Sequence, residues 1–191
     1  MGKENINYKI ILLTPFFVFV ICYLKAQTYS EFKKIERSFK VIPSSTVDIT
    51  NKYGKIHIVK WDKDSVKFII NLSVKTDEID KAEEILKNID INFSGTHYYV
   101  TAKTHFQSDE NSFLDDIKKL TEGIVESESE VRIDYTIHVP GYLNLKINNK
   151  YGDVYSDDIQ GNFDLILSNG DFEANSINGN GVVNLKLCKA V

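Results

Sequence analysis

The chain of 191 residues has a formal net charge of −4, with 26% charged and 42% hydrophobic residues, which is ordinary for a folded protein of one domain or two small ones. The acidic balance provides no basic surface for nucleic acid, so that class of partner is excluded. Ten Tyr and eleven Phe favour strands over helices.

Residues 1–26 have the pattern of a secretory signal peptide. A positively charged start precedes an apolar run at 10–24, and the small residue Ala26 stands where signal peptidase would cleave. A transmembrane anchor is the alternative, but the run is short for a span of ~20 residues and contains Pro15. We therefore expect the mature protein to begin at Gln27.

The mature chain would be an exported protein without disulfides. Its one cysteine is Cys188, and Cys22 lacks the small preceding residue that a lipoprotein signal needs. Export without disulfides suits a bacterial envelope protein in the periplasm, on the outer-membrane surface or in the medium.

Residues 27–106 predict a strand-rich module with one amphipathic helix. Alternating apolar residues indicate strands within 38–51, 55–61 and 65–76. Within 76–89, apolar residues recur at spacings of three and four, as in a helix with one buried face. A hairpin over 90–106 is expected to turn at Ser94 and Gly95.

Residues 107–130 interrupt this pattern with eight acidic residues against Lys118 and Lys119. We interpret the segment as a flexible, solvated acidic loop. Binding of a partner or a cation is the alternative.

Residues 131–191 return to strand patterns and contain a repeat. Four glycines recur every nine residues, each followed by Asp or Asn: Gly152, Gly161, Gly170 and Gly179. Apolar residues stand two positions after the first three, at Val154, Phe163 and Phe172. At a spacing of eighteen, Ile159 corresponds to Ile177. The glycines suit a turn that needs either a positive φ or a small residue.

This self-similarity predicts a mainly β protein with a β-solenoid of about 18 residues per rung, each rung stacking on the next. The alternative is an antiparallel meander with similar turns. Because the chain stops in the middle of the pattern, the solenoid is expected to be truncated.

The tetrapeptide Asn-Lys-Tyr-Gly occurs twice, each time after an alternating apolar run. The copies are Asn51-Lys52-Tyr53-Gly54 and Asn149-Lys150-Tyr151-Gly152. We interpret both as points where a strand meets a turn, with the asparagines bonding turn backbone groups and the tyrosines covering the core edge. The second copy would start the solenoid, and the first an equivalent strand in the amino-terminal module.

On these residues the chain resembles an adhesin-like family of exported bacterial proteins with β-strand repeats. The resemblance covers roughly residues 39–187 and rests on "VDITNKYGKIHIVKW", "VRIDYTIHVP" and segment 145–187. It implies an exported, repeat-rich β protein with an adhesive role, and it carries no functional residues to transfer.

No catalytic motif accompanies the repeat, and we expect neither metal nor cofactor. The four histidines lack the spacing of metal ligands, and no nucleotide-binding or nucleophile motif occurs. The turn carboxylates are Asp153, Asp157, Asp158 and Asp171. A glycosidase pair and a calcium β-roll remain open for them, although the GGxGxD unit of the β-roll is missing. We interpret them as solvated turn residues.

The sequence therefore favours a non-catalytic, adhesin-type protein of the envelope or surface that binds a surface glycan or protein. A carbohydrate-active β-helical enzyme and a periplasmic sensor or interaction module are the alternatives. The final strand is apolar at Val183, Leu185 and Leu187. It predicts an open edge that pairs with another copy, a partner strand or further sequence.

Overall fold

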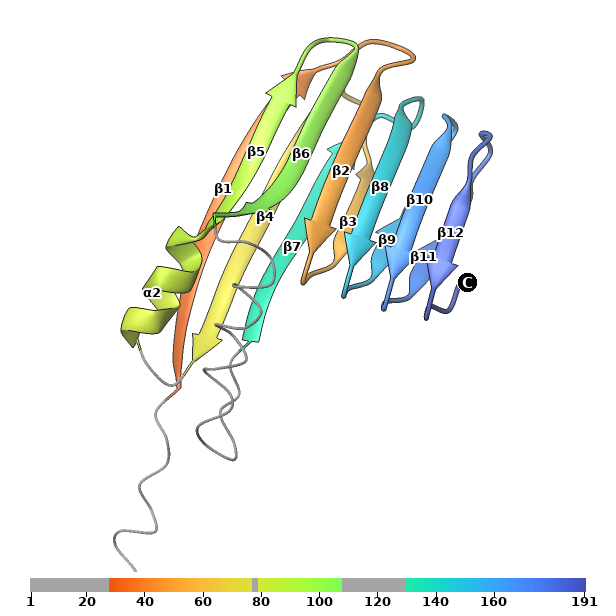
Figure 1. Ribbon diagram of the computed structural model, residues 1–191. Coiled ribbons are helices and arrows are strands. Elements are labelled where there is room, and N and C mark those ends of the chain that lie inside the picture. Colours follow the sequence, from red (N-terminus) through yellow and green to blue (C-terminus); the bar gives the residue numbers. More distant parts are fainter. Residues whose placement is uncertain (1–27, 77–78, 108–129) are drawn as a thin grey trace, which may run out of the picture.

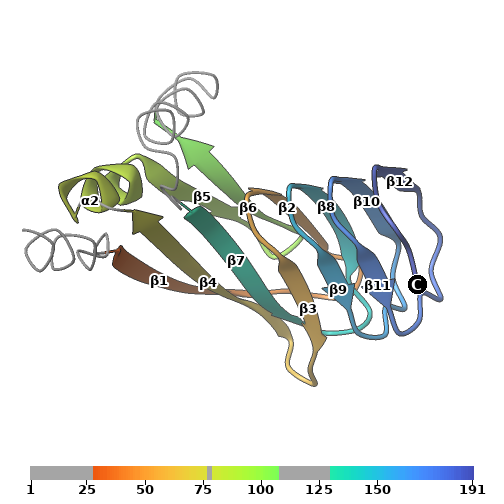
Figure 2. The ribbon, with the colours of Figure 1, turned by 90° about the horizontal axis from the view of Figure 1, so that it is seen from below.

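The computed structural model describes residues 28–76, 79–107 and 130–191. Most of them lie in two six-stranded sheets that face each other (Figure 1, Figure 2). The first sheet has the order β1 (Tyr29–Lys40), β4 (Ser65–Thr76), β7 (Glu130–Val139), β3 (Ile56–Lys60), β9 (Val154–Ser156) and β11 (Phe172–Ala174). The second has the order β12 (Val183–Lys186), β10 (Phe163–Ser168), β8 (Asn144–Lys150), β2 (Thr46–Lys52), β6 (Tyr99–Phe106) and β5 (Ile89–Gly95).

The mainly β fold class is confirmed. The signal peptide predicted at 1–26 lies outside the described residues, as does 108–129 of the predicted acidic loop.

An apolar core fills the space between the sheets, because successive strand residues point to opposite faces. The predicted apolar face of β4 is entirely buried, with Val66, Phe68, Ile70, Leu72 and Val74 each at most 1% exposed. The same alternation buries Ile133, Tyr135 and Ile137 in β7. Period-two patterning therefore identified the core of the central strands.

The helix predicted within 76–89 is confirmed as α2 (Ile79–Lys87), which lies at the β1–β4 end of the sheets with Ala82 and Ile85 buried (Figure 1). The hairpin was predicted with the wrong turn, because Ser94 and Gly95 still belong to β5. The chain reverses at 96–98 instead, where the Thr96 hydroxyl accepts the N–H groups of Tyr98 and Tyr99.

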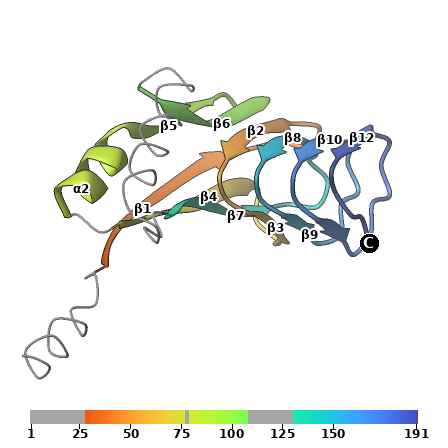
Figure 3. The same ribbon diagram turned by 60° about the horizontal axis from the view of Figure 1, so that its bottom comes forward.

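Residues 144–186 pair in parallel at an offset of eighteen. β8 pairs with β10, β10 with β12, and β9 with β11, each with partners eighteen positions apart. The predicted correspondence of Ile159 with Ile177 is a parallel bridge. An antiparallel meander is therefore wrong for this segment. Within each repeat the chain crosses from the second sheet to the first and returns (Figure 3).

The strands β2 and β3 continue this stack of parallel-paired units. β2 pairs in parallel with β8, which places Asn51 opposite Asn149, and β3 pairs in parallel with β9. The two NKYG segments are therefore equivalent positions in neighbouring units, the units being β2–β3, β8–β9 and β10–β11. The segment between β3 and β8 separates these two units in the sequence only, because its strands β6 and β7 pair with the opposite sides of β2 and β3.

Each unit turns its corner through a left-handed residue placed before the glycine. Tyr53, Tyr151 and Asn169 have φ values of 65°, 60° and 56°. No glycine in the described part of the chain has a positive φ, so the expectation that glycine supplies it is wrong. The second expectation, a need for a small residue, fits: a Cβ on Gly152 would lie 2.1 Å from the carbonyl oxygen of Gly54 in the neighbouring unit.

Candidate functional site

The NKYG asparagines hold one corner of the stack together. Asn51 Nδ2 donates to the carbonyl oxygens of Gly54 (3.3 Å) and Ile133 (2.9 Å). Asn149 Nδ2 donates to the carbonyl oxygens of Gly54 (3.0 Å) and Gly152 (2.8 Å). The prediction that these side chains bond turn backbone groups is confirmed, and both asparagines are buried.

The NKYG tyrosines form a stacked pair beside that corner. The Tyr53 and Tyr151 ring centroids are 5.5 Å apart, with 5° between the ring planes. The left-handed φ that both residues share and the register of β2 with β8 give the rings the same orientation. Tyr53 also meets Phe106 edge to face at 6.0 Å. Tyr151 is 43% exposed and therefore covers less of the core edge than predicted.

The lysines of both tetrapeptides lie over these rings. Lys52 Nζ is 5.0 Å from the Tyr53 ring centroid, and Lys150 Nζ is 4.9 Å from that of Tyr151. At these distances the negative face of each ring attracts the ammonium group. The corner therefore combines exposed aromatic surface with positive charge.

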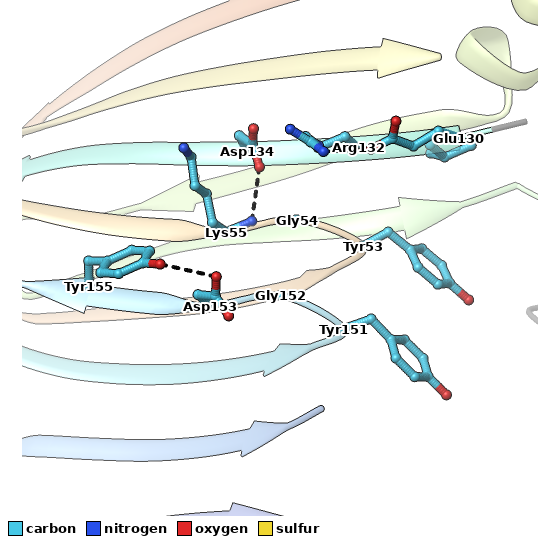
Figure 4. Close-up of a pocket in the computed structure, with 11 residues that line it drawn as sticks. Tyr53, Gly54, Lys55, Glu130, Arg132, Asp134, Tyr151, Gly152, Asp153 and Tyr155 are labelled. Carbon is cyan, nitrogen blue, oxygen red and sulfur yellow. Dashed lines mark hydrogen bonds and ion pairs between the residues drawn. The ribbon is translucent and has the colours of Figure 1, made fainter. Parts of the chain in front are cut away.

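A groove of about 430 Å³ opens beside the two rings (Figure 4). We call it the tyrosine groove. It is lined by two corners and two strands: Tyr53, Gly54, Lys55, Tyr151, Gly152, Asp153, Tyr155, Glu130, Val131, Arg132 and Asp134. Its volume falls within the ~300–1,000 Å³ that small-molecule sites usually occupy.

Two carboxylates of the tyrosine groove accept backbone N–H groups from residues that directly precede neighbouring strands. Asp134 Oδ1 accepts the Lys55 N–H at 2.9 Å. Asp153 Oδ1 accepts the Asp171 N–H at 2.8 Å, and its Oδ2 accepts the Tyr155 hydroxyl at 3.1 Å (Figure 4). Both aspartates are therefore fixed acceptors, and for Asp153 this differs from the purely solvated turn residue that we expected.

The other turn carboxylates are bonded in the same manner. Asp171 Oδ1 accepts the Lys189 N–H at 3.2 Å, and Asp157 Oδ2 accepts the Lys60 N–H at 2.9 Å. Asp158 Oδ1 accepts the Ser176 hydroxyl at 2.9 Å. Each bond joins residues of neighbouring repeats, either through a backbone N–H or through a side-chain hydroxyl, so the acids of the repeat help to fix its register.

Tyr155 lines the groove, and its hydroxyl donates to Asp153 Oδ2. Its bond to Asp153, followed by burial, raises the pKa of the Tyr155 hydroxyl above its usual value. The phenol therefore stays protonated at neutral pH. The remaining charged pair, Arg132 and Glu130, joins at 2.6 Å on the exposed start of β7.

Two of the four histidines pack against aromatic rings. His57 meets the Tyr155 ring edge to face at 6.2 Å, and His138 lies against Trp61 at 5.2 Å. Within the described ranges, no group of three or more His, Cys, Asp or Glu side chains could hold a metal ion. Cys188 is a half-buried free thiol near the Leu167 carbonyl oxygen, at 3.4 Å.

The repeat residues named from the sequence divide into core and corner positions. Val154, Ile159, Phe163 and Phe172 are buried, and Ile177 packs against them partly exposed. Gly161, Gly170 and Gly179 lie against the backbone of the preceding repeat. Of the named set, the groove gathers only Tyr53, Gly54, Tyr151 and Gly152.

Sequence reasoning missed Lys55, Arg132 and Glu130, which supply most of the groove's charge. Lys55 follows the first NKYG directly, so its position was a usable signal. Nothing in the local sequence places the start of β7 beside that corner.

Comparison with known proteins gives distant structural likenesses only. The sequence matches no family model and no curated protein. A putative cell adhesion protein from Clostridium sporogenes is 12% identical, with a TM-score of 0.37 over 83% of this chain and 100% of that one. A putative adhesin from Parabacteroides merdae is 8% identical, with a TM-score of 0.29 over 80% of this chain and 55% of that one. A putative lipid binding protein from Parabacteroides distasonis is 14% identical, with a TM-score of 0.26 over 82% of this chain and 75% of that one.

At these identities and TM-scores the likenesses carry no inference about what this chain binds. In the described part of the chain, no helix has the length and apolarity needed to cross a membrane.

Proposed function

We propose that the chain is a non-catalytic, adhesin-type protein of the cell envelope or surface, which binds its ligand at the tyrosine groove. The observation that carries this proposal is that the groove combines hydrogen-bonded aspartates with an exposed aromatic ring. Asp134 and Asp153 each hold a backbone N–H, while the Tyr151 ring remains exposed. Fixed acceptors beside an exposed ring suit recognition of a polar ligand.

A β-solenoid is the scaffold in this proposal. The parallel offset of eighteen residues from β8 to β12 supports it, as does the continuation of the stack into β2–β3. Such a stack presents equivalent corners at regular intervals along one side, which is a suitable design for a binding surface.

The test of this function is a screen of residues 27–191 against glycan and extracellular-matrix protein arrays. We expect saturable binding to at least one glycan or matrix protein, with the bound ligand recovered unchanged. Hydrolysis of a bound glycan would support the carbohydrate-active enzyme instead. Absence of all binding would contradict the proposal and favour the sensor or interaction module.

Export is the second part of the proposal, supported by the charged start, the apolar run at 10–24 and Ala26. We expect amino-terminal sequencing of envelope or secreted material from a bacterial host to begin at Gln27. Recovery of the intact amino terminus in a membrane fraction would indicate an anchor.

Self-association through β12 is the third part. Its inward side chains Val183 and Leu185 are 44% and 37% exposed, whereas the equivalent Leu165 and Leu167 of β10 are fully buried. We expect another copy to cover this apolar edge, so sedimentation should show concentration-dependent dimers of the mature chain. A monomer at tens of micromolar, with or without reductant, is the result that contradicts this part.

A further inference from the structure

We propose that a second groove, on the outer face of the second sheet, binds a neutral linear glycan that runs across the strands. The groove has a volume of about 480 Å³ and lies over β6, β2, β8, β10 and β12, which are side by side in Figure 1. We call it the outer groove, and its central residues are Asp48, Lys146, Asn148, Asp164, Ile166 and Asn184. It shares no lining residue with the tyrosine groove, so this inference goes beyond the proposed function and adds a second site.

The central side chains project from one face of one sheet, so a ligand can contact them together. β8 and β10 pair in parallel, with Asn148 opposite Ile166 and Lys146 opposite Asp164. β12 continues this register on the other side of β10 and places Asn184 opposite Ile166. Residues alternate between buried and accessible along β8 and β10, which assigns these side chains to the outer face.

Ile166 provides an apolar floor between two amides. Its side chain is 51% exposed. Neighbouring strands are ~4.8 Å apart, so Asn148 and Asn184 flank Ile166 at about that distance on either side. Within the described part of the chain, neither amide hydrogen-bonds another residue, so both are available to a ligand. The C–H groups of a sugar ring can pack on Ile166 while hydroxyls at the ring edge bond the amides.

The charges at the outer groove balance, which favours an uncharged ligand. Lys103 Nζ pairs with Asp48 Oδ2 at 3.3 Å. Lys146 lies between Asp48 and Asp164 in the register of β2, β8 and β10. An anion bound at Lys146 would therefore meet a carboxylate on either side, and a cation bound at a carboxylate would meet a lysine. Hydroxyl groups both donate and accept hydrogen bonds, so a sugar can use both kinds of partner.

The shape of the outer groove favours a chain of sugars over a single sugar. From β6 to β12 it crosses four strand spacings, or roughly 19 Å. Thr50 of β2 lies opposite Asn148, so short polar side chains continue along the groove beyond the central site. Among the described residues that line the groove, none is aromatic, so nucleic-acid bases would find no stacking platform there.

Two variants remove ligand contacts without disturbing the core. Asn148→Ala deletes one flanking amide and Ile166→Ala shortens the apolar floor, and both side chains are exposed. Asn71→Ala is the matched control, because Asn71 is an exposed asparagine of β4 in the opposite sheet. Tyr151→Asn separates the two grooves, since Asn169 already occupies the equivalent corner with a φ of 56°, close to the 60° of Tyr151.

The experiment titrates residues 27–191 and the four variants with cellohexaose, mannohexaose and maltohexaose. The corresponding monosaccharides and hexagalacturonate serve as comparisons. Binding is followed by saturation-transfer NMR, and thermal melts verify folding. We expect at least one neutral hexasaccharide to bind about tenfold or more tightly than its monosaccharide, with an affinity that is insensitive to salt. Asn148→Ala and Ile166→Ala should each weaken this binding by about fivefold or more, whereas Asn71→Ala and Tyr151→Asn should not.

Several results would overturn the inference. Binding of hexagalacturonate alone excludes a neutral ligand, and equal affinity for a monosaccharide and its hexasaccharide excludes a linear one. Unchanged binding by folded Asn148→Ala and Ile166→Ala excludes the outer groove, and absence of binding by every oligosaccharide contradicts the inference as a whole. The proposed function is judged separately by the array screen, where a ligand lost in Tyr151→Asn would still support adhesion at the tyrosine groove.

Discussion

Replacing Gly152 with alanine is expected to cost more than ~4 kcal/mol of unfolding free energy, or to prevent folding. The new Cβ would lie 2.1 Å from the carbonyl oxygen of Gly54 and 2.5 Å from its carbonyl carbon. Those atoms belong to the backbone of the neighbouring unit, which cannot retreat without breaking the parallel pairing of β3 with β9. Denaturant melts of the purified variant measure the loss.

Gly141→Ala is the matched control for this prediction. Its Cβ would meet the Cε of Lys60 at 3.1 Å, the flexible end of an exposed side chain. Neither glycine has a positive φ, so the two variants differ in the available space rather than in backbone strain. We expect a cost below about 1 kcal/mol for Gly141→Ala. Similar costs for both variants would show that the units are not packed as closely as described.

The spacing of eighteen in the sequence made the strand pairing within residues 144–186 predictable. A parallel stack of equal units pairs each residue with the residue one period later, so the spacing of eighteen directly gave the register of β8, β10 and β12. Phe163 and Phe172 hold equivalent positions two residues after a repeat glycine, and both are buried in the core. Sequence reasoning went wrong at the corner, where the left-handed φ belongs to Tyr151 and the glycine provides space instead.

The order of the strands in the two sheets was much harder to predict from the sequence. The pairing of β2 with β8 joins residues far apart in the chain, and the only local sign of it was the second NKYG. The groove depends on a further long-range event, since β7 must lie beside β3 to bring Arg132 near the tyrosines. Local periodicity fixes the faces of a strand but not its neighbours, so Tyr151 was identified as a corner residue without the other residues that line the tyrosine groove.

Removing either ring of the Phe163–Phe172 pair is expected to cost about 3–5 kcal/mol. Phe163 of β10 and Phe172 of β11 are 1% and 6% exposed, and their rings stack at 5.6 Å with 15° between the planes. They come from opposite sheets, so alanine at either position leaves a cavity in the core between them. Chemical denaturation of Phe163→Ala and Phe172→Ala, each compared with the unsubstituted chain, gives the two costs.

The double variant and a surface control separate core packing from general effects on the strand. Because the two rings touch, Phe163→Ala and Phe172→Ala together should cost less than the sum of the single costs, by about 0.5–3 kcal/mol. Ile166 lies on the outer face of β10 and is 51% exposed, so Ile166→Ala should cost less than about 1 kcal/mol. Single costs below about 0.5 kcal/mol for both phenylalanines would place the rings at the surface, and strict additivity would mean that they do not share one cavity.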